Sequence, residues 1–179
     1  MNQKFMIIDD FYDIAHQYRQ SIINDELMIT DETTQKLSYI LGGPVEITQA
    51  FNEVKGESND NIVTANLECD WIAVIYLTLP PDCVSKKGVS FYKHRKTNLD
   101  CFPNEYACQI NGWQNMTDIE NSFDVSNPND WEEYSNVFVK YNRCILFRGD
   151  FWHSYGYGFG NEINNSMINQ KLLIRNGKC

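Results

Sequence analysis

Residues 61–80, NIVTANLECDWIAVIYLTLP, contain the clearest strand signal in the chain. From Trp71 to Leu79 most residues are apolar and many are β-branched or aromatic, which is typical of a buried strand. Pro80-Pro81 ends this run, because proline cannot donate a hydrogen bond to a neighbouring strand. The polar segment Thr64-Ala65-Asn66 precedes the strand and, taken alone, predicts an ordinary turn.

Helical patterns lie before this strand and strand patterns lie after it. Segments 14–26 and 31–43 carry apolar residues at helical spacing, with Asp31 expected to cap the second helix and Gly42-Gly43 to end it. Further strands are expected over residues 88–95, 133–142, 143–153 and 167–177, with a turn at Tyr141-Asn142. Helices followed by a run of antiparallel strands predict an α+β fold, a sandwich or jelly roll with the helices on one side.

The length of 179 residues suits one domain, 1–179. Within it, residues 1–43 form an N-terminal strand and helices, and residues 61–176 form the β-rich part, with a loop-rich insertion at 98–133. Residues 44–60 show no clear period.

Charge restricts the kinds of partner. The chain has 24 acidic and 15 basic residues, a net charge of −9, and no run of Lys and Arg long enough to attract nucleic acid or an anionic membrane. We therefore expect protein or small-molecule partners, while the oligomeric state is left open. The start of the chain lacks a signal-peptide pattern and no apolar run is long enough to span a membrane, so a cytoplasmic location, or a virion if a phage encodes the chain, is expected.

Two further motifs receive plain structural interpretations. The six cysteines contain no Cys-x-x-Cys pair, which argues against a zinc site and favours reduced thiols in a chain without a secretory signal. The segment Gly156-Tyr157-Gly158-Phe159-Gly160 lacks the Lys-Ser/Thr of a phosphate-binding loop, so a tight glycine turn is expected.

Four segments, taken in order, resemble the 2-oxoglutarate/Fe(II) oxygenase-like family, in particular its small prolyl-hydroxylase-like members from bacteria and phages. The segments are IIDDFYD with YRQSII, WIAVIYLTLPP, KGVSFYKHR and YNRCILFRGDFWHSYGYGFG. The likeness covers residues 5–174 and implies a double-stranded β-helix, a jelly-roll or cupin-like barrel with one open mouth.

The resemblance also implies a metal site, from which this chain departs. Active members hold Fe(II) with His-x-Asp and a later histidine, leaving coordination positions for 2-oxoglutarate and oxygen. The later histidine corresponds to His153, but Thr64 and Asn66 occupy the His-x-Asp positions. The basic residue that would pair with 2-oxoglutarate falls at Met167. No histidine lies between His16 and His94, so the loss of the first ligand does not depend on the alignment.

The favoured interpretation is a catalytically degenerate oxygenase-like protein without a cofactor. It would act as a binding or structural module, in a phage particle or another assembly. Tyr76, Phe91 and Phe151 are expected in its core or lining its pocket.

The alternative is an active hydroxylase that uses Fe(II) and 2-oxoglutarate at a rearranged site. His94 and His153, with Asp70 or Asp150, would then bind the metal, while Arg175 or Lys171 would bind the cosubstrate. His94 also has a structural interpretation, because the family carries a histidine there besides its metal ligands. A third hypothesis is a metal-free pocket for a sugar or a small acid.

Overall fold

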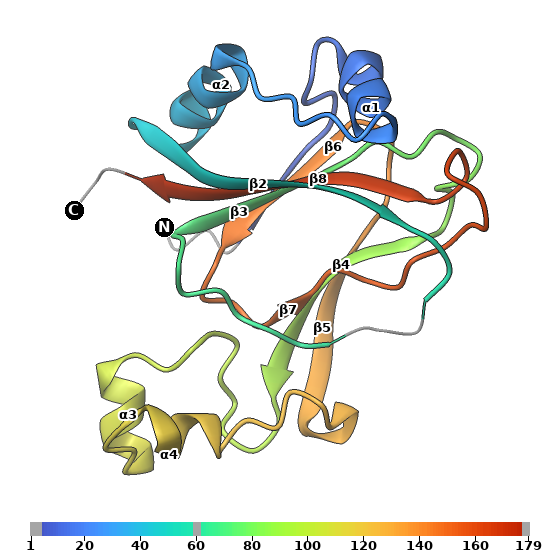
Figure 1. Ribbon diagram of the computed structural model, residues 1–179. Helices are drawn as coiled ribbons and strands as arrows, with labels where there is room; N and C mark the ends of the chain where they lie inside the picture. The colour runs from blue at the N-terminus through green and yellow to red at the C-terminus, as the bar shows by residue number, and fades with distance from the viewer. Residues whose placement is uncertain (1–4, 59–61, 177–179) are drawn as a thin grey trace.

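A computed structural model describes residues 5–58 and 62–176 of the chain. Two antiparallel sheets face each other, and helices cover the outer side of the larger one (Figure 1). The larger sheet has the strand order β1-β6-β3-β8-β2, and the smaller sheet has the order β5-β4-β7. The strands are β1 (Phe5–Ile8), β2 (Val45–Lys55), β3 (Trp71–Tyr76), β4 (Lys87–His94), β5 (Trp131–Phe138), β6 (Arg143–Arg148), β7 (His153–Ser154) and β8 (Met167–Asn176).

Strand β3 shows why the central strand of the larger sheet is apolar on both faces. Its side chains alternate, so Ile72, Val74 and Tyr76 pack between the sheets while Ala73 and Ile75 pack beneath the helices. Both faces are therefore buried, and a continuous apolar run results. The strand predicted from the opening segment is confirmed.

The helices α1 (Ala15–Ile23) and α2 (Asp31–Leu41) lie over the outer face of the larger sheet, as predicted. A buried polar link ties this layer to the sheet, because the Tyr12 hydroxyl donates to Gln170 Oε1 at 2.6 Å. The amide of Gln170 in turn donates to the Met28 carbonyl and to Asn52 Oδ1, both at 3.0 Å. The fully buried Gln170 thus has partners for both ends of its amide, as a buried polar group requires.

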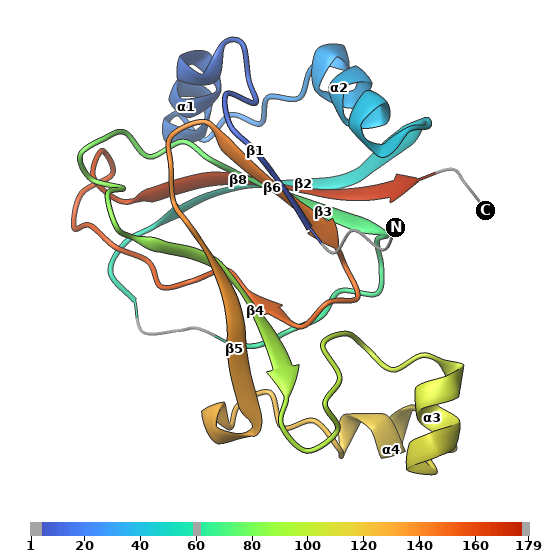
Figure 2. The same ribbon diagram turned by 180° about the vertical axis from the view of Figure 1, so that it is seen from behind.

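The insertion between β4 and β5 is more ordered than the sequence predicts. It contains α3 (Glu105–Asn111), α4 (Met116–Glu120) and a 3₁₀ turn at Pro128–Asp130, placed beyond the smaller sheet (Figure 2). A separate aromatic core joins it to the outer face of that sheet; its buried members are Val63, Tyr92, Ile119, Phe123, Trp131 and Trp152.

One local expectation is wrong, and two others are made specific by the structure. Thr30, not Asp31, caps α2, and its hydroxyl accepts from the Thr33 amide. Residues 44–60 contain the long edge strand β2, which pairs with β8. The predicted turn at Tyr141-Asn142 is confirmed, with Asn142 at φ 59°, and the strands β5 and β6 that it joins lie in different sheets.

Two global expectations can also be compared with the structure. Within residues 5–58 and 62–176, no helix is both long and apolar enough to cross a membrane. The five cysteines of that part, Cys69, Cys83, Cys101, Cys108 and Cys144, are free thiols, and Cys179 lies outside it.

Candidate functional site

Thr64 and His153 lie side by side at the edge of the smaller sheet. The Thr64 amide donates to the His153 carbonyl at 2.8 Å, and the His153 amide donates to the Thr64 carbonyl at 2.9 Å. Residues that exchange both hydrogen bonds in an antiparallel pair project their side chains to the same face. Because Val63 and Ala65 pack on the outer face, Thr64 and His153 both project between the sheets.

His153 is completely buried and held in one tautomer. Its Nδ1 lies 2.7 Å from the Phe151 carbonyl, which can only accept, so Nδ1 carries the proton. Nε2 therefore presents a lone pair, and it has no hydrogen-bond partner among the described residues. Burial, joined by the nearby Lys171 ammonium, lowers the pKa of His153 to about 4, although the Phe151 contact raises it. The imidazole is neutral at physiological pH.

Asn66 differs from Thr64 in where its side chain goes. Its Oδ1 accepts the Glu68 amide at 2.8 Å, which makes it a turn-forming group at the end of the barrel. Its backbone amide donates to the Gly149 carbonyl at 2.7 Å. A Cβ on Gly149 would stand 2.4 Å from the Asn66 carbonyl, so glycine is required for this close approach.

Aromatic rings fill the space around His153 between the sheets. The His153 ring lies 4.8 Å from the Phe147 ring and 5.0 Å from the Tyr155 ring, measured between centroids. Phe91 contacts Phe147 edge-on at 5.3 Å and is stacked by Phe5 at 4.6 Å. Phe91 is fully buried, so it belongs to the core between the sheets.

Tyr76 reaches from the larger sheet toward the smaller one. It is fully buried, which raises its pKa well above the ordinary value for tyrosine, although the Val89 backbone lowers it in part. A Cβ at Gly88 would stand 2.7 Å from the Tyr76 hydroxyl oxygen, so the glycine of the KKG segment makes room for this ring.

Strand β8 places its alternate residues between the sheets. Met167, at the position of the expected basic residue, is fully buried in the apolar core. Lys171 also points inward, where its ammonium pairs with Glu53 at 3.0 Å and lies 3.9 Å from the centre of the Tyr155 ring. Asn169 donates to the same Glu53 carboxylate at 2.9 Å.

Glu53, Lys171, Asn169 and Tyr155 form an inner network between the sheets, and its two charges balance. Burial raises the pKa of Glu53, but Lys171 and Asn169 more than offset it, so the net pKa is lowered and the group is a carboxylate. The ammonium and the carboxylate neutralise each other, as a partly buried pair requires.

The structure does not bring His94 to His153. Tyr92 and His94 share the outer face of β4, whereas Phe91 and its partner His153 project inward. The His94 ring packs 4.7 Å from Phe123, and its Nδ1 lies 3.0 Å from the Thr97 hydroxyl. This placement matches the structural interpretation of His94.

The two aspartates and Arg175 lie at the end of the barrel rather than inside it. Asp70 accepts the Asn176 amide at 2.8 Å, and Asp150 receives a two-pronged contact from Arg148 at 2.5 and 3.0 Å. Asn66, Asp70 and Asp150 line a shared surface groove of about 440 Å³ that does not include His153. Arg175 is exposed beside Glu46.

Phe151 lies at the same end of the barrel. Its ring is 5.8 Å from the Arg148 guanidinium carbon, and its backbone pairs with Cys101. Through its carbonyl it also orients the His153 ring.

These positions allow the expected iron site to be tested against the residues present. Within the described parts of the chain, no three His, Cys, Asp or Glu side chains gather so as to hold a metal ion. Beside His153 stand a threonine hydroxyl, aromatic rings and a lysine ammonium. The two-histidine, one-carboxylate set that Fe(II) requires is not formed by these groups.

The inner network was only partly foreseen from sequence. The sequence predicts Lys171 as a possible cosubstrate ligand, but it does not predict a role for Glu53, Asn169 or Tyr155. The two-residue period of β8 could have indicated that Met167, Asn169 and Lys171 share a face. Glu53 gave no such signal, because residues 44–60 have no clear period and pairing with β8 alone places it.

Two facing antiparallel sheets with helices on one side define the chain as a double-stranded β-helix, a jelly-roll barrel of the α+β class. No family model and no curated protein matches the sequence.

Solved structures do match the fold. The chain is similar to the non-heme alpha ketoglutarate dependent epimerase SnoN from nogalamycin biosynthesis, with 11% identity, a TM-score of 0.57, and coverage of 97% of this chain and 78% of that one. It is also similar to HygX from Streptomyces hygroscopicus with nickel and 2-oxoglutarate bound, with 11% identity, a TM-score of 0.49, and coverage of 98% and 83%. At this identity the likeness establishes the fold, and the prediction of a double-stranded β-helix is confirmed.

Proposed function

We propose that this chain is an oxygenase-like barrel that does not carry out iron chemistry and serves as a binding module. The observation that carries the proposal is Thr64, which stands beside His153 where the resemblance would place the first histidine ligand. A threonine hydroxyl is a far weaker ligand than an imidazole, and changes to outer-shell groups alone commonly cost about 10–100-fold in metal affinity.

Electrostatics support the same conclusion. The Lys171 ammonium repels a proton on His153 and so contributes to the lowered pKa of that imidazole, and the same ammonium already pairs with Glu53. A divalent cation placed by the imidazole would be repelled by the ammonium, and residues 5–58 and 62–176 gather no metal-binding cluster of acidic side chains to neutralise it. Met167 supports the proposal as well, because this apolar side chain is fully buried at the position where the resemblance would place a basic cosubstrate-binding residue.

The module would contact its partner through surfaces outside the barrel interior. In the α3–α4 insertion, Tyr106, Ile110 and Met116 are each more than half exposed, which suits protein contacts in a larger assembly such as a phage particle.

An anaerobic calorimetric titration with Mn(II) or Fe(II) and 2-oxoglutarate tests the proposal. We expect no binding at millimolar ligand. Micromolar binding that disappears in His153→Ala would show that the barrel holds a metal after all.

A gain-of-ligand variant makes the test sharper. Thr64→His places a second imidazole beside His153, and we expect it to bind Mn(II) more tightly than the natural protein does. Asn66 is left unchanged, because its side chain bonds the Glu68 amide rather than facing His153. Thr64→Ser is the matched control, because it changes the same position without adding a strong ligand. If the folded Thr64→His variant binds Mn(II) no better than Thr64→Ser, the assignment of Thr64 to the ligand position is contradicted.

A further inference from the structure

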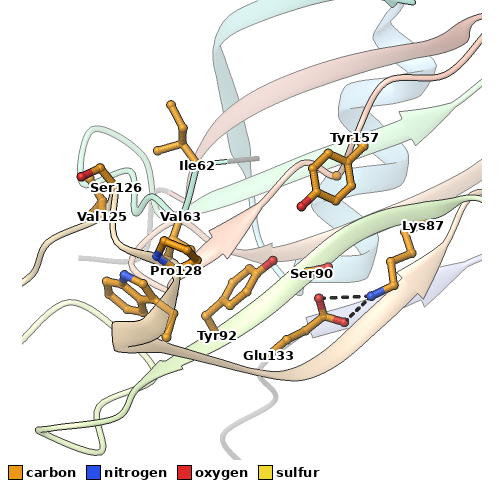
Figure 3. Close-up of a pocket in the computed structure, with 12 residues that line it drawn as sticks. Ile62, Val63, Lys87, Ser90, Tyr92, Val125, Ser126, Pro128, Glu133 and Tyr157 are labelled. Atoms are coloured by element: carbon orange, nitrogen blue, oxygen red, sulfur yellow. Dashed lines mark hydrogen bonds and ion pairs between the residues drawn. The ribbon is translucent and has the colours of Figure 1, made fainter. Parts of the chain in front are cut away.

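A second recess lies on the opposite face of the smaller sheet, away from His153. It has a volume of about 460 Å³, within the ~300–1,000 Å³ of small-molecule sites. Figure 3 shows Tyr92 and Ser90 on its floor, Tyr157 on one side and Val125 and Pro128 on the other. Lys87 and Glu133 close one end as an ion pair, with Nζ 3.0 Å and 3.4 Å from the two carboxylate oxygens.

The Gly-Tyr-Gly-Phe-Gly segment explains how Tyr157 comes to stand over this recess. Gly156 has φ +79°, and a Cβ there would stand 2.6 Å from the Gly88 carbonyl of β4. A Cβ at Gly158 would stand 2.0 Å from the Gly56 carbonyl that follows β2. On both sides of Tyr157, therefore, the loop packs so closely against neighbouring backbone that only glycine fits.

Neighbouring contacts add to this hold. Lys55 donates to the Gly156 carbonyl at 3.2 Å, and the Gly158 amide donates to the Ser58 hydroxyl at 3.2 Å. Phe159 is buried in the core between the sheets, whereas Tyr157 is 47% exposed. The loop backbone is thus held in place and carries a half-exposed aromatic ring, so ordering the backbone adds little to the entropy cost of binding a ligand against that ring.

The polar groups of the recess indicate the charge of its ligand. Lys87 and Glu133 cancel, and the hydrogen bond from Lys87 to Glu133 raises the lysine pKa, so the pair stays charged and balanced. A charged ligand would have to break this balance, whereas a neutral ligand with several hydroxyls could donate to Glu133 and accept from Lys87. The Ser126 hydroxyl donates to Asp124 at 2.6 Å, so its oxygen remains as an acceptor for a ligand, whereas the buried Ser90 hydroxyl already accepts from Asn136 at 2.7 Å.

We propose that this recess binds a neutral saccharide of one or two rings, with one pyranose stacked on Tyr157 and its hydroxyls bonded to the Lys87–Glu133 pair. A pyranose has an apolar C–H face, which suits the negative face of an aromatic ring, and a rim of hydroxyls that suits a paired donor and acceptor. The saccharide site is independent of the iron question, because it lies on the other face of the smaller sheet and uses none of the residues around His153.

Saturation-transfer NMR with glucose, galactose, N-acetylglucosamine, cellobiose and maltose tests the proposal on the intact protein. We expect at least one of them to bind with a Kd in the millimolar range, followed by titration calorimetry for the best binder. Tyr157→Ala should weaken that binding by about tenfold or more. Tyr39→Ala is the matched control, because Tyr39 is a tyrosine 88% exposed on α2, and it should leave the affinity unchanged.

A charge variant distinguishes a specific saccharide site from a surface that binds ligands non-specifically. Glu133→Gln leaves Lys87 without its partner, so we expect weaker binding of the neutral sugar and stronger binding of glucuronate. The proposal is overturned if no neutral sugar gives transfer at about 50 mM, or if Tyr157→Ala binds as the natural protein does. It is equally overturned if glucuronate or a proline-rich peptide binds the natural protein more tightly than every neutral sugar.

Discussion

His153 is the residue whose state depends most on the fold around it. In the folded protein burial lowers its pKa to about 4, against 6.5 for an ordinary histidine. Between these values the unfolded chain binds a proton that the folded protein does not, so the free energy of unfolding falls as the pH drops from about 6.5 to 4. At pH 4 the loss amounts to about 3 kcal/mol.

Urea denaturation across about pH 4.5 to 7.5 measures this effect, with His153→Gln as the comparison. We expect the variant to lose most of the pH dependence in this window. His94, whose pKa is also lowered chiefly by burial, contributes in the same direction and stays in both proteins. Equal slopes for the two proteins would mean that His153 is protonated as easily in the folded state as in the unfolded chain.

At the same scale, the resemblance predicts both Thr64 and Asn66 beside His153. The structure brings Thr64 to His153, whereas the Asn66 side chain bonds the Glu68 amide instead. Neither the Phe151 carbonyl on Nδ1 nor the rings of Phe147 and Tyr155 could be predicted, because each depends on strand pairing between distant segments.

Among the elements, the loop at residues 156–160 restricts the amino-acid sequence most clearly, because its glycines leave no room for a side chain. Gly158→Ala would place a methyl group against the Gly56 carbonyl, so we expect a loss of about 2–4 kcal/mol in the free energy of unfolding. Gly112→Ala is the matched control: Gly112 has φ +73° but open space around it, so only backbone strain of about 1–2 kcal/mol is expected. Chemical denaturation of both variants compares the two costs. Equal losses would show that the loop can move away from β2.

Element prediction succeeded where a local signal was strong and failed where pairing decided. The β3 strand follows from its composition. The tight glycine turn expected at residues 156–160 is wrong: Gly156 and Gly160 have positive φ, but the segment is a loop without a turn, and the turn follows at residues 163–165. The sequence on either side of Asn142 would equally allow a hairpin, yet β5 and β6 enter different sheets. Asn142 takes part in this crossing, because its side-chain amide bonds the Tyr12 backbone at 2.8 and 2.9 Å and its own amide donates to the Tyr76 carbonyl.

For the molecule as a whole, the Lys171–Glu53 pair tests whether the barrel interior is held together by its own charges. The two side chains are 16% and 31% exposed, so each charge is costly to leave alone. Lys171→Met should lower the free energy of unfolding by about 2–3 kcal/mol at pH 7, because Glu53 loses its main counter-charge. The loss should shrink as the pH falls, because the stabilisation from Glu53 is present above its unfolded pKa and lost through its lowered folded pKa.

A double-mutant cycle with Glu53→Gln measures the coupling, which we expect to be about 1–2 kcal/mol. The pair Lys87 and Glu133 is the matched control, because it is more exposed and should couple by less than about 1 kcal/mol. Additive losses at Lys171 and Glu53 would mean that the inner pair contributes no more than a surface contact.

The sequence alone determined the α+β class, the placement of two helices before most of the strands, and the absence of any histidine between His16 and His94. These features are local, since they follow from composition, periodicity and the identity of single residues. Only the tertiary structure decided that β2 completes the larger sheet, that His94 and His153 occupy opposite faces, and that Tyr157 stands over a recess. Those outcomes depend on which distant strands exchange hydrogen bonds, and a change of one residue in that pairing would move every side chain to the other face.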